Sequence, residues 1–272
     1  MLFGLFGKKR QIVDEQNTVM LRGKLSFAAT EAYKLLRANL MFSSPDENGC
    51  RVFAITSAIR GEGKSTTSVN LAYTMAETGK RVLLVDADLR LPTVAKKLDI
   101  RMAPGLSNVL AGIETVENAF YRPEGMENLA ILTSGDIPPN PTELLGSAKM
   151  AELIANLRAQ FDFIIIDVPP VNIVSDALVV SALVDGYAVV VKENYSTRRE
   201  LAACMRGLSL AEGKVVGIVM TGADDGSGRY RYKKYKRYGK YKYGKYGHRY
   251  SAYESDAYEQ GEEPAEPTEE NN

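Results

Sequence analysis

Short runs of apolar, largely β-branched residues alternate with longer amphipathic stretches along most of the chain. The runs predict strands at Val52–Thr56, Arg81–Val85, Leu129–Leu132, Phe163–Ile166, Ala188–Val191 and Val215–Met220. The longer stretches predict helices near residues 27–41, 64–78, 106–111, 142–159, 175–183 and 197–210. Several strands are apolar at every position, which is typical of parallel strands covered by helices on both faces. The pattern therefore predicts an α/β fold with a mostly parallel, doubly wound sheet.

The composition suits one globular domain with an appended segment, since the chain has 272 residues of which 45% are hydrophobic. The longest apolar runs are far shorter than the roughly 18 residues needed to cross a bilayer. The charges of Lys8, Lys9 and Arg10 follow the apolar start of the chain, whereas in a secretory signal they come first. We therefore expect a cytoplasmic location. Two cysteines and one histidine also argue against a disulfide framework or a zinc site.

Charge is balanced overall, with 34 Lys plus Arg and 34 Asp plus Glu, but it is segregated near the C-terminus. Residues 229–249 carry ten basic residues and no acid, whereas residues 250–272 carry eight acids and no Lys or Arg. Ten tyrosines fall in this part of the chain: Tyr230, Tyr232, Tyr235, Tyr238, Tyr241, Tyr243, Tyr246, Tyr250, Tyr253 and Tyr258. With few aliphatic residues among them, they cannot offset the entropy of ordering. We expect a flexible segment over 1–23, a folded domain over 24–224 and a disordered tail over 225–272.

A glycine-rich turn lies between the first predicted strand and the helix that follows it. Its residues are Ser57-Ala58-Ile59-Arg60-Gly61-Glu62-Gly63-Lys64-Ser65-Thr66, with Ala58 in place of the first glycine of the usual phosphate-loop pattern. Backbone N–H groups in such a turn surround phosphate oxygens, Lys64 reaches the terminal phosphates and Ser65 binds magnesium. The sequence therefore predicts a phosphate-loop NTPase fold that binds ATP and Mg²⁺. The predicted nucleotide-binding residues are Gly61, Glu62, Gly63, Lys64, Ser65 and Thr66.

Acidic residues end two further predicted strands. Asp86 and Asp88 follow the strand at Arg81–Val85, and Asp167 follows the strand at Phe163–Ile166. Because ligands of open parallel sheets lie beyond the carboxyl ends of the strands, we expect these acids to converge on the phosphate loop. We predict that they bind magnesium together with Ser65, and that Asp86 or Asp88 deprotonates the attacking oxygen. The alternative for Asp88 is a cap on the following helix.

Taken together, these motifs resemble the bacterial tyrosine kinases of capsule and exopolysaccharide synthesis, over roughly residues 24 to 260. The resemblance rests on the phosphate loop, on Val85-Asp86-Ala87-Asp88-Leu89-Arg90, on Ile166-Asp167-Val168-Pro169-Pro170, and on Gly135 with Pro138-Pro139-Asn140-Pro141-Thr142-Glu143-Leu144-Leu145. The terminal tyrosine cluster completes the set. An acidic motif of this kind combined with a tyrosine-rich tail is specific to that family.

The resemblance implies ATP-dependent autophosphorylation, with Lys64, Asp86 and Asp88 as catalytic residues and the ten tail tyrosines as acceptors. It also implies a membrane adaptor whose intracellular tail activates the kinase and recruits it to the inner face of the membrane, and a phosphatase that reverses the modification. Finally, it implies a ring-shaped homo-oligomer held by a Glu-x-x-Arg-x-x-Arg helix. Glu31, Lys34 and Arg37 occupy those positions, and Lys34 cannot make the bidentate carboxylate contact of an arginine. The alternative for this helix is a solvated charged face.

Three other interpretations stay open. The ATPases that position division sites or plasmids use a related phosphate loop, but they carry an extra lysine where this chain has Ile59. The interleaved Lys, Arg and Tyr residues of the tail are also compatible with binding to single-stranded nucleic acid or anionic lipid. We expect nucleic acid not to be a partner. A passive tail on a scaffold without transferase activity is a third reading, against which the intact Lys64, Ser65, Asp86 and Asp167 argue.

Overall fold

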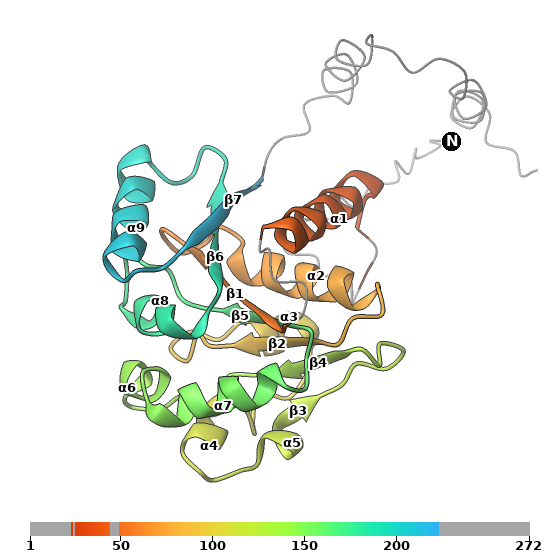
Figure 1. The fold of residues 1–272 in the computed structure, drawn as a ribbon. Helices are drawn as coiled ribbons and strands as arrows, with labels where there is room; N and C mark the ends of the chain where they lie inside the picture. The colour runs from red at the N-terminus through yellow and green to blue at the C-terminus, as the bar shows by residue number, and fades with distance from the viewer. Residues whose placement is uncertain (1–22, 24, 44–48, 223–272) are drawn as a thin grey trace, which may run out of the picture. The chain divides into compact units, whose positions relative to one another are not determined.

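One mostly parallel sheet of seven strands organises the chain in the computed structural model, which describes residues 23, 25–43 and 49–222 (Figure 1). The strands are β1 (Arg51–Ser57), β2 (Val82–Asp86), β3 (Phe120–Tyr121), β4 (Leu129–Leu132), β5 (Phe163–Asp167), β6 (Gly186–Lys192) and β7 (Val215–Thr221). Their order across the sheet is β3-β4-β2-β5-β1-β6-β7. Only the short β3 pairs antiparallel, with β4, and the other neighbours are parallel. The predicted sheet is confirmed.

Helices cover this sheet on both faces (Figure 1). They are α1 (Phe27–Phe42), α2 (Lys64–Ala76), α3 (Val94–Leu98), α4 (Leu106–Leu110), α5 (Val116–Ala119), α6 (Pro141–Leu145), α7 (Ala148–Arg158), α8 (Asp176–Val179) and α9 (Arg198–Leu210), with a 3₁₀ turn at Ser181–Leu183. No helix within these described ranges is long and apolar enough to span a membrane. The predicted tail over 225–272, the N-terminal segment over 1–23 (Gly23 apart) and all ten predicted acceptor tyrosines lie outside the described residues.

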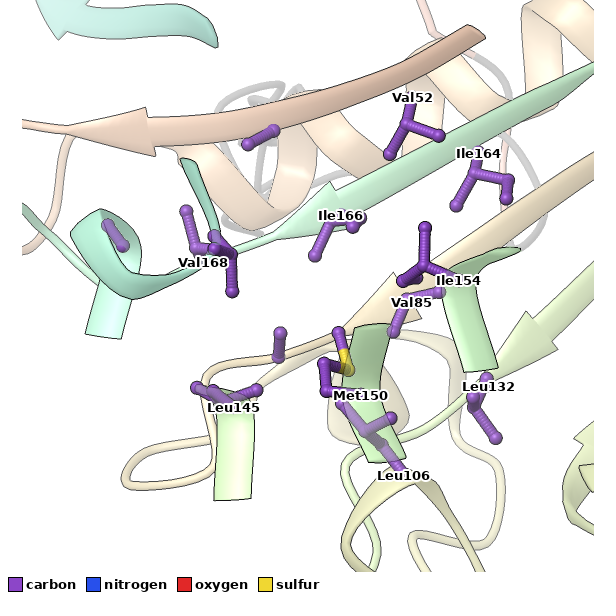
Figure 2. Close-up of a cluster of buried hydrophobic side chains, with 14 of the residues drawn as sticks. Val52, Val85, Leu106, Leu132, Leu145, Met150, Ile154, Ile164, Ile166 and Val168 are labelled. Carbon is purple, nitrogen blue, oxygen red and sulfur yellow. The ribbon is translucent and has the colours of Figure 1, made fainter. Parts of the chain in front are cut away.

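Successive residues of each central strand pack into different halves of the core, because side chains alternate between the faces of a sheet. Ile164 and Ile166 of β5 join a cluster with Met150 and Ile154 of α7 (Figure 2). Ile165 points to the other face and packs with α1 and α2 side chains. Both faces of β5 are thus buried, which explains why its sequence is apolar without alternation.

Two predicted helices are interrupted. The stretch 142–159 forms α6 and α7, because Ser147 adopts an extended conformation and its Oγ accepts a hydrogen bond from Met150 N (3.2 Å), which caps a new helix. The stretch 175–183 ends as a helix at Val179 and continues as the 3₁₀ turn. The short elements α3, α5 and β3 carry too few residues for a periodic signal and were not predicted.

Candidate functional site

The phosphate loop connects β1 to α2, and its backbone depends on two glycines. Gly61 and Gly63 have φ angles of +83° and +92°, which residues with a Cβ rarely adopt. A Cβ at Gly61 would also lie 2.7 Å from the hydroxyl oxygen of Tyr195. Gly63 is the residue before the first turn of α2, so the free backbone N–H groups of that turn face the end of the loop. This is the geometry that binds phosphate at a helix N-terminus.

Glu62 holds the loop to the body of the domain. Its side chain is fully buried, and Oε2 accepts a hydrogen bond from Ile59 N at 2.9 Å. Oε1 accepts hydrogen bonds from Ser196 Oγ at 2.6 Å and from Lys192 N at 3.4 Å, and the Glu62 carbonyl accepts one from Thr221 Oγ1 at 2.7 Å. The carboxylate therefore stabilises the loop, and the predicted contact of Glu62 with a nucleotide would use its backbone N–H instead. No motif in the sequence indicated that Ser196 contacts the phosphate loop through Glu62.

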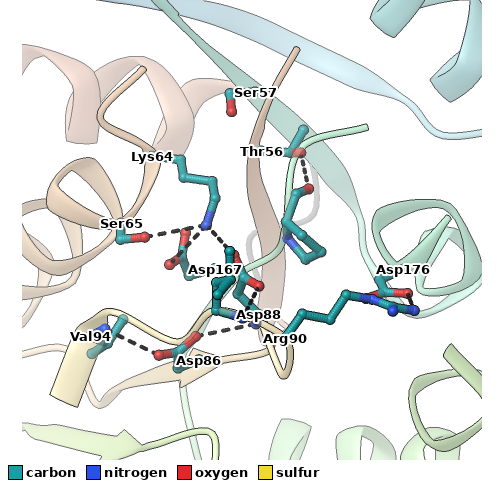
Figure 3. Close-up of polar contacts among 12 residues, drawn as sticks. Thr56, Ser57, Lys64, Ser65, Asp86, Asp88, Arg90, Val94, Asp167 and Asp176 are labelled. Atoms are coloured by element: carbon teal, nitrogen blue, oxygen red, sulfur yellow. Dashed lines mark hydrogen bonds and ion pairs between the residues drawn. The ribbon is translucent and has the colours of Figure 1, made fainter. Parts of the chain in front are cut away.

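Lys64 lies among the predicted carboxylates at the carboxyl edge of the sheet (Figure 3). Its Nζ lies 2.9 Å from Asp88 Oδ2 and 3.7 Å from Asp167 Oδ2, and it also donates to Ser65 Oγ at 3.4 Å. Burial alone would lower the pKa of Lys64, but the charges of Asp167 and Asp88 outweigh burial and raise the pKa above its ordinary value. The ammonium group is therefore charged at neutral pH.

Asp86 and Asp167 end the neighbouring strands β2 and β5 and are paired in register. The Asp86 carboxylate accepts hydrogen bonds from the backbone groups Asp88 N and Val94 N, both at 3.2 Å. Asp167 Oδ1 accepts a hydrogen bond from the side-chain hydroxyl of Ser68 at 3.1 Å. Burial raises the pKa of Asp86 to about 7, and the Asp167 charge adds to the shift. Burial also raises the pKa of Asp167, against the opposing effect of Lys64. Such a carboxyl group can exchange a proton near neutral pH.

Magnesium fits this group of side chains. Asp167 Oδ2 and Thr66 Oγ1 are buried polar atoms that lack a hydrogen-bond partner among the described residues. In the same part of the chain, no three acidic, histidine or cysteine side chains are clustered tightly enough to enclose a metal ion. Magnesium does not require such a cage, because it binds one or two carboxylates together with phosphate oxygens and water. Ser65, Asp86 and Asp167 could supply such ligands, whereas Asp88 is paired with Lys64.

Arg90 fixes the loop that follows Asp88. Its guanidinium makes a bidentate contact with the fully buried carboxylate of Asp176, at 2.8 and 3.1 Å (Figure 3). Thr142 Oγ1 donates to Asp176 Oδ1 at 2.5 Å and accepts from Arg90 Nη2 at 2.9 Å. The acidic motif after β2 is thereby tied to the start of α6 and to α8. Arg90 and Thr142 lie in motifs that the sequence singled out, whereas Asp176 lies in none of them.

The structure places the residues predicted for an oligomer interface on α1. Lys34 Nζ and Glu31 Oε1 form an exposed ion pair at 2.7 Å, three residues apart on the helix. Arg37 Nη1 donates to Thr74 O of α2 at 2.6 Å, within the same chain. Glu31 and Lys34 therefore face outward, whereas Arg37 already forms a hydrogen bond to α2 of its own chain. The ring interface stays a prediction.

Fold and site together define a phosphate-loop NTPase. The family model described as an AAA domain matches residues 50–202 of the chain. The septum site-determining protein MinD from Pyrococcus horikoshii, solved in complex with Mg-ADP, superposes with a TM-score of 0.55 at 27% identity, over 65% of this chain and 72% of that one. The phosphate-loop fold is therefore confirmed.

More similar proteins define the family. The tyrosine-protein kinase YwqD of Bacillus subtilis is 40% identical over 71% of this chain and 81% of its own length. The putative tyrosine-protein kinase CapB of Staphylococcus aureus is 37% identical over 70% and 83%. The kinase domain of the Escherichia coli tyrosine kinase ETK superposes with a TM-score of 0.69 at 30% identity, over 80% of each chain. The chain belongs to the family of bacterial tyrosine-protein kinases, as the sequence motifs predicted.

Proposed function

We propose that this protein is an ATP-dependent protein-tyrosine kinase that phosphorylates the tyrosines of its own C-terminal segment. The observation that carries the proposal is the group formed by Lys64, Asp86, Asp88 and Asp167 at the start of α2, in a chain that is 40% identical to a tyrosine-protein kinase. The positioning ATPases share the fold, but the kinases match the chain more closely.

In this proposal the loop N–H groups and Lys64 bind the β- and γ-phosphates of ATP. A tyrosine hydroxyl oxygen attacks the γ-phosphorus, the bond to the bridging oxygen of ADP breaks, and the phenol proton passes to a carboxylate. Asp86 suits the role of base because its pKa of about 7 allows it to accept a proton at neutral pH. With Asp86 as the base, magnesium held by Ser65 and Asp167 would neutralise charge on the phosphates.

The biological setting follows from the same family. We propose that the kinase regulates capsular or exopolysaccharide synthesis and export. A membrane adaptor would activate it through an intracellular tail and recruit it to the inner face of the membrane, and a tyrosine phosphatase would reverse the modification. Ring assembly through α1 belongs to this proposal, with Lys34 as the position that departs from the family pattern.

Intact-mass analysis after incubation with MgATP tests the proposal. The samples are the native chain, Lys64→Ala and a form truncated after Gly228, each with and without a candidate adaptor tail. We expect several phosphates on the native chain and none on the other two. ADP release without any mass gain, even with the adaptor, would instead support a positioning ATPase whose tyrosine segment serves binding.

A further inference from the structure

A basic cavity of about 980 Å³ lies at the edge of the sheet opposite the phosphate loop. Its walls include Arg51 and Phe163 at the amino ends of β1 and β5, Phe42 at the end of α1 and Arg158 at the end of α7. Asp86 and Asp167 of the nucleotide site are the last residues of β2 and β5. The five residues of β5 therefore separate the two sites, at about 3.3 Å per residue. The cavity is not part of the nucleotide site.

Positive charge dominates this cavity. Asp162 is the single acidic side chain among the described residues that line it, against five basic ones: Arg37, Arg51, Lys80, Arg81 and Arg158. The Arg81 side chain is 56% exposed, and its ion pair with Asp162 (2.8 Å) is of the surface kind that contributes little stability. Lys80 is exposed and no carboxylate of the described residues lies within ion-pair distance of it. Arg158 is already paired with Asp185 (3.0 Å), so Lys80 and Arg81, both exposed, are the side chains that we expect an anion to contact.

Aromatic rings accompany these cations. Phe42 is 86% exposed, so its large apolar ring offers a hydrophobic surface on the wall of the cavity. The guanidinium carbon of Arg51 lies 6.0 Å from the centre of the Phe163 ring, within the range of a cation–π contact. Arginines that bind phosphate oxygens beside an exposed aromatic surface match a ligand that carries both a phosphate group and an aromatic ring.

We propose that the basic cavity binds the phosphorylated segment around Tyr253 and Tyr258 of this chain, an inference that rests on the proposed autophosphorylation. These two tyrosines lie beside Glu254, Asp256 and Glu259 in a stretch without Lys or Arg, so each phosphate adds to a local negative charge. The seven tyrosines before Tyr250 are instead interspersed with ten basic residues, which oppose binding to a basic wall.

The length of the chain permits this contact. Tyr253 lies thirty-two positions after Thr221, the last residue of β7, and an extended segment of that length spans up to roughly 100 Å. A phosphorylated segment held at the amino edge of the sheet is kept away from the nucleotide site at the carboxyl edge. The cavity would thus retain the product of the reaction and leave the active site open to tyrosines that are not yet modified.

The test measures binding of fluorescent peptides that span residues 248–260 to the full-length chain, treated with a tyrosine phosphatase and kept free of nucleotide. One peptide carries phosphate on Tyr253 and Tyr258, a second is unmodified, and a third carries the substitutions Tyr253→Glu and Tyr258→Glu. We expect the phosphopeptide to bind at least tenfold more tightly than the other two. The double variant Lys80→Ala/Arg81→Ala should lose that advantage, whereas Arg206→Ala, an exposed arginine of α9 outside the cavity, should keep it.

Equal affinity for the three peptides would overturn the proposal, as would an equal loss in Arg206→Ala, which would indicate attraction by net charge. Displacement of the phosphopeptide by MgADP would also overturn it, since binding would then occur at the nucleotide site. Because the phosphates are introduced chemically, the result does not depend on kinase activity. A failure of phosphate transfer and a failure of this cavity to bind are therefore separate outcomes.

Discussion

Lys64 Nζ lies 2.9 Å from Asp88 Oδ2, so the cation of the phosphate loop is paired with an acid of the motif that follows β2. In the proposed site, the phosphate groups of a nucleotide and the Asp88 carboxylate would therefore compete for the same ammonium group. Magnesium would relieve this competition, because a divalent cation offsets the negative charge that the phosphates bring beside the carboxylates. Nucleotide affinity should consequently depend on the metal through Asp88.

Asp88→Asn should raise the affinity for ADP in the presence of EDTA by about tenfold, since it frees Lys64 and removes a negative charge near the phosphates. With excess Mg²⁺ the variant should bind ADP no better than the native chain. Calorimetric titration under both conditions measures this difference. Glu152→Gln, an exposed neutralisation on α7, serves as the control and should change neither value. A weaker affinity of Asp88→Asn for ADP in EDTA would contradict the competition.

Asp86 should make the domain less stable as the pH rises towards neutral. The folded pKa of about 7 lies above the ordinary value of 3.8, so between these limits the folded chain keeps a proton that the unfolded chain releases. The free energy of unfolding contributed by this group is therefore full at low pH and is lost as the pH rises through 7. Between pH 5 and pH 8 the loss is roughly 2 to 3 kcal/mol.

Asp86→Asn removes this titration and should flatten the dependence of the unfolding free energy on pH. Urea denaturation of the nucleotide-free protein at pH 5, 6, 7 and 8 measures the two slopes, and titrating groups that do not interact with Asp86 cancel in their difference. The comparison of slopes also cancels the constant cost of an amide that cannot accept both backbone hydrogen bonds. Parallel curves for the two proteins would show that Asp86 titrates as an ordinary carboxyl group.

Arg90→Ala should destabilise the domain by about 2 kcal/mol, because it leaves the fully buried Asp176 carboxylate with Thr142 but without its cation. Arg81→Ala removes an exposed ion pair of similar length and should lower the unfolding temperature much less. Thermal unfolding compares the two. Arg90→Lys restores the charge without the bidentate geometry, so its stability should lie between that of Arg90→Ala and that of the native chain. Equal losses in Arg90→Ala and Arg81→Ala would refute a structural role for this contact.

Glu62→Ala should weaken MgADP binding by about tenfold or more, since the phosphate loop loses the carboxylate that joins it to Ile59 N and Ser196 Oγ. Ser196→Ala removes one of these contacts from the far side and should cause a smaller loss in the same direction. Titration with MgADP measures both, and circular dichroism verifies the fold. An unchanged affinity in Glu62→Ala would mean that the glycines alone set the loop.

The sequence predicted correctly that residues at or next to the ends of strands lie close together. Lys64, Asp86 and Asp167 could be placed together because parallel strands share one carboxyl edge. Asp176 and Ser196 could not, since each belongs to a short helix or loop whose position depends on packing across the domain. The break between α6 and α7 was missed for a related reason: Ser147 caps a helix within a stretch whose apolar spacing is continuous.

The position of β5 between β1 and β2 also constrains how the domain can fold during its synthesis on the ribosome. Residues 51–90 contain β1, the phosphate loop, β2 and one acidic motif. The two strands are joined in the sheet only through β5, which is synthesised about eighty residues later. A nascent chain that ends before Asp167 therefore lacks both the central strand and a carboxylate of the site. Bound nucleotide would therefore stabilise the nascent domain only after β5 has left the ribosomal exit tunnel.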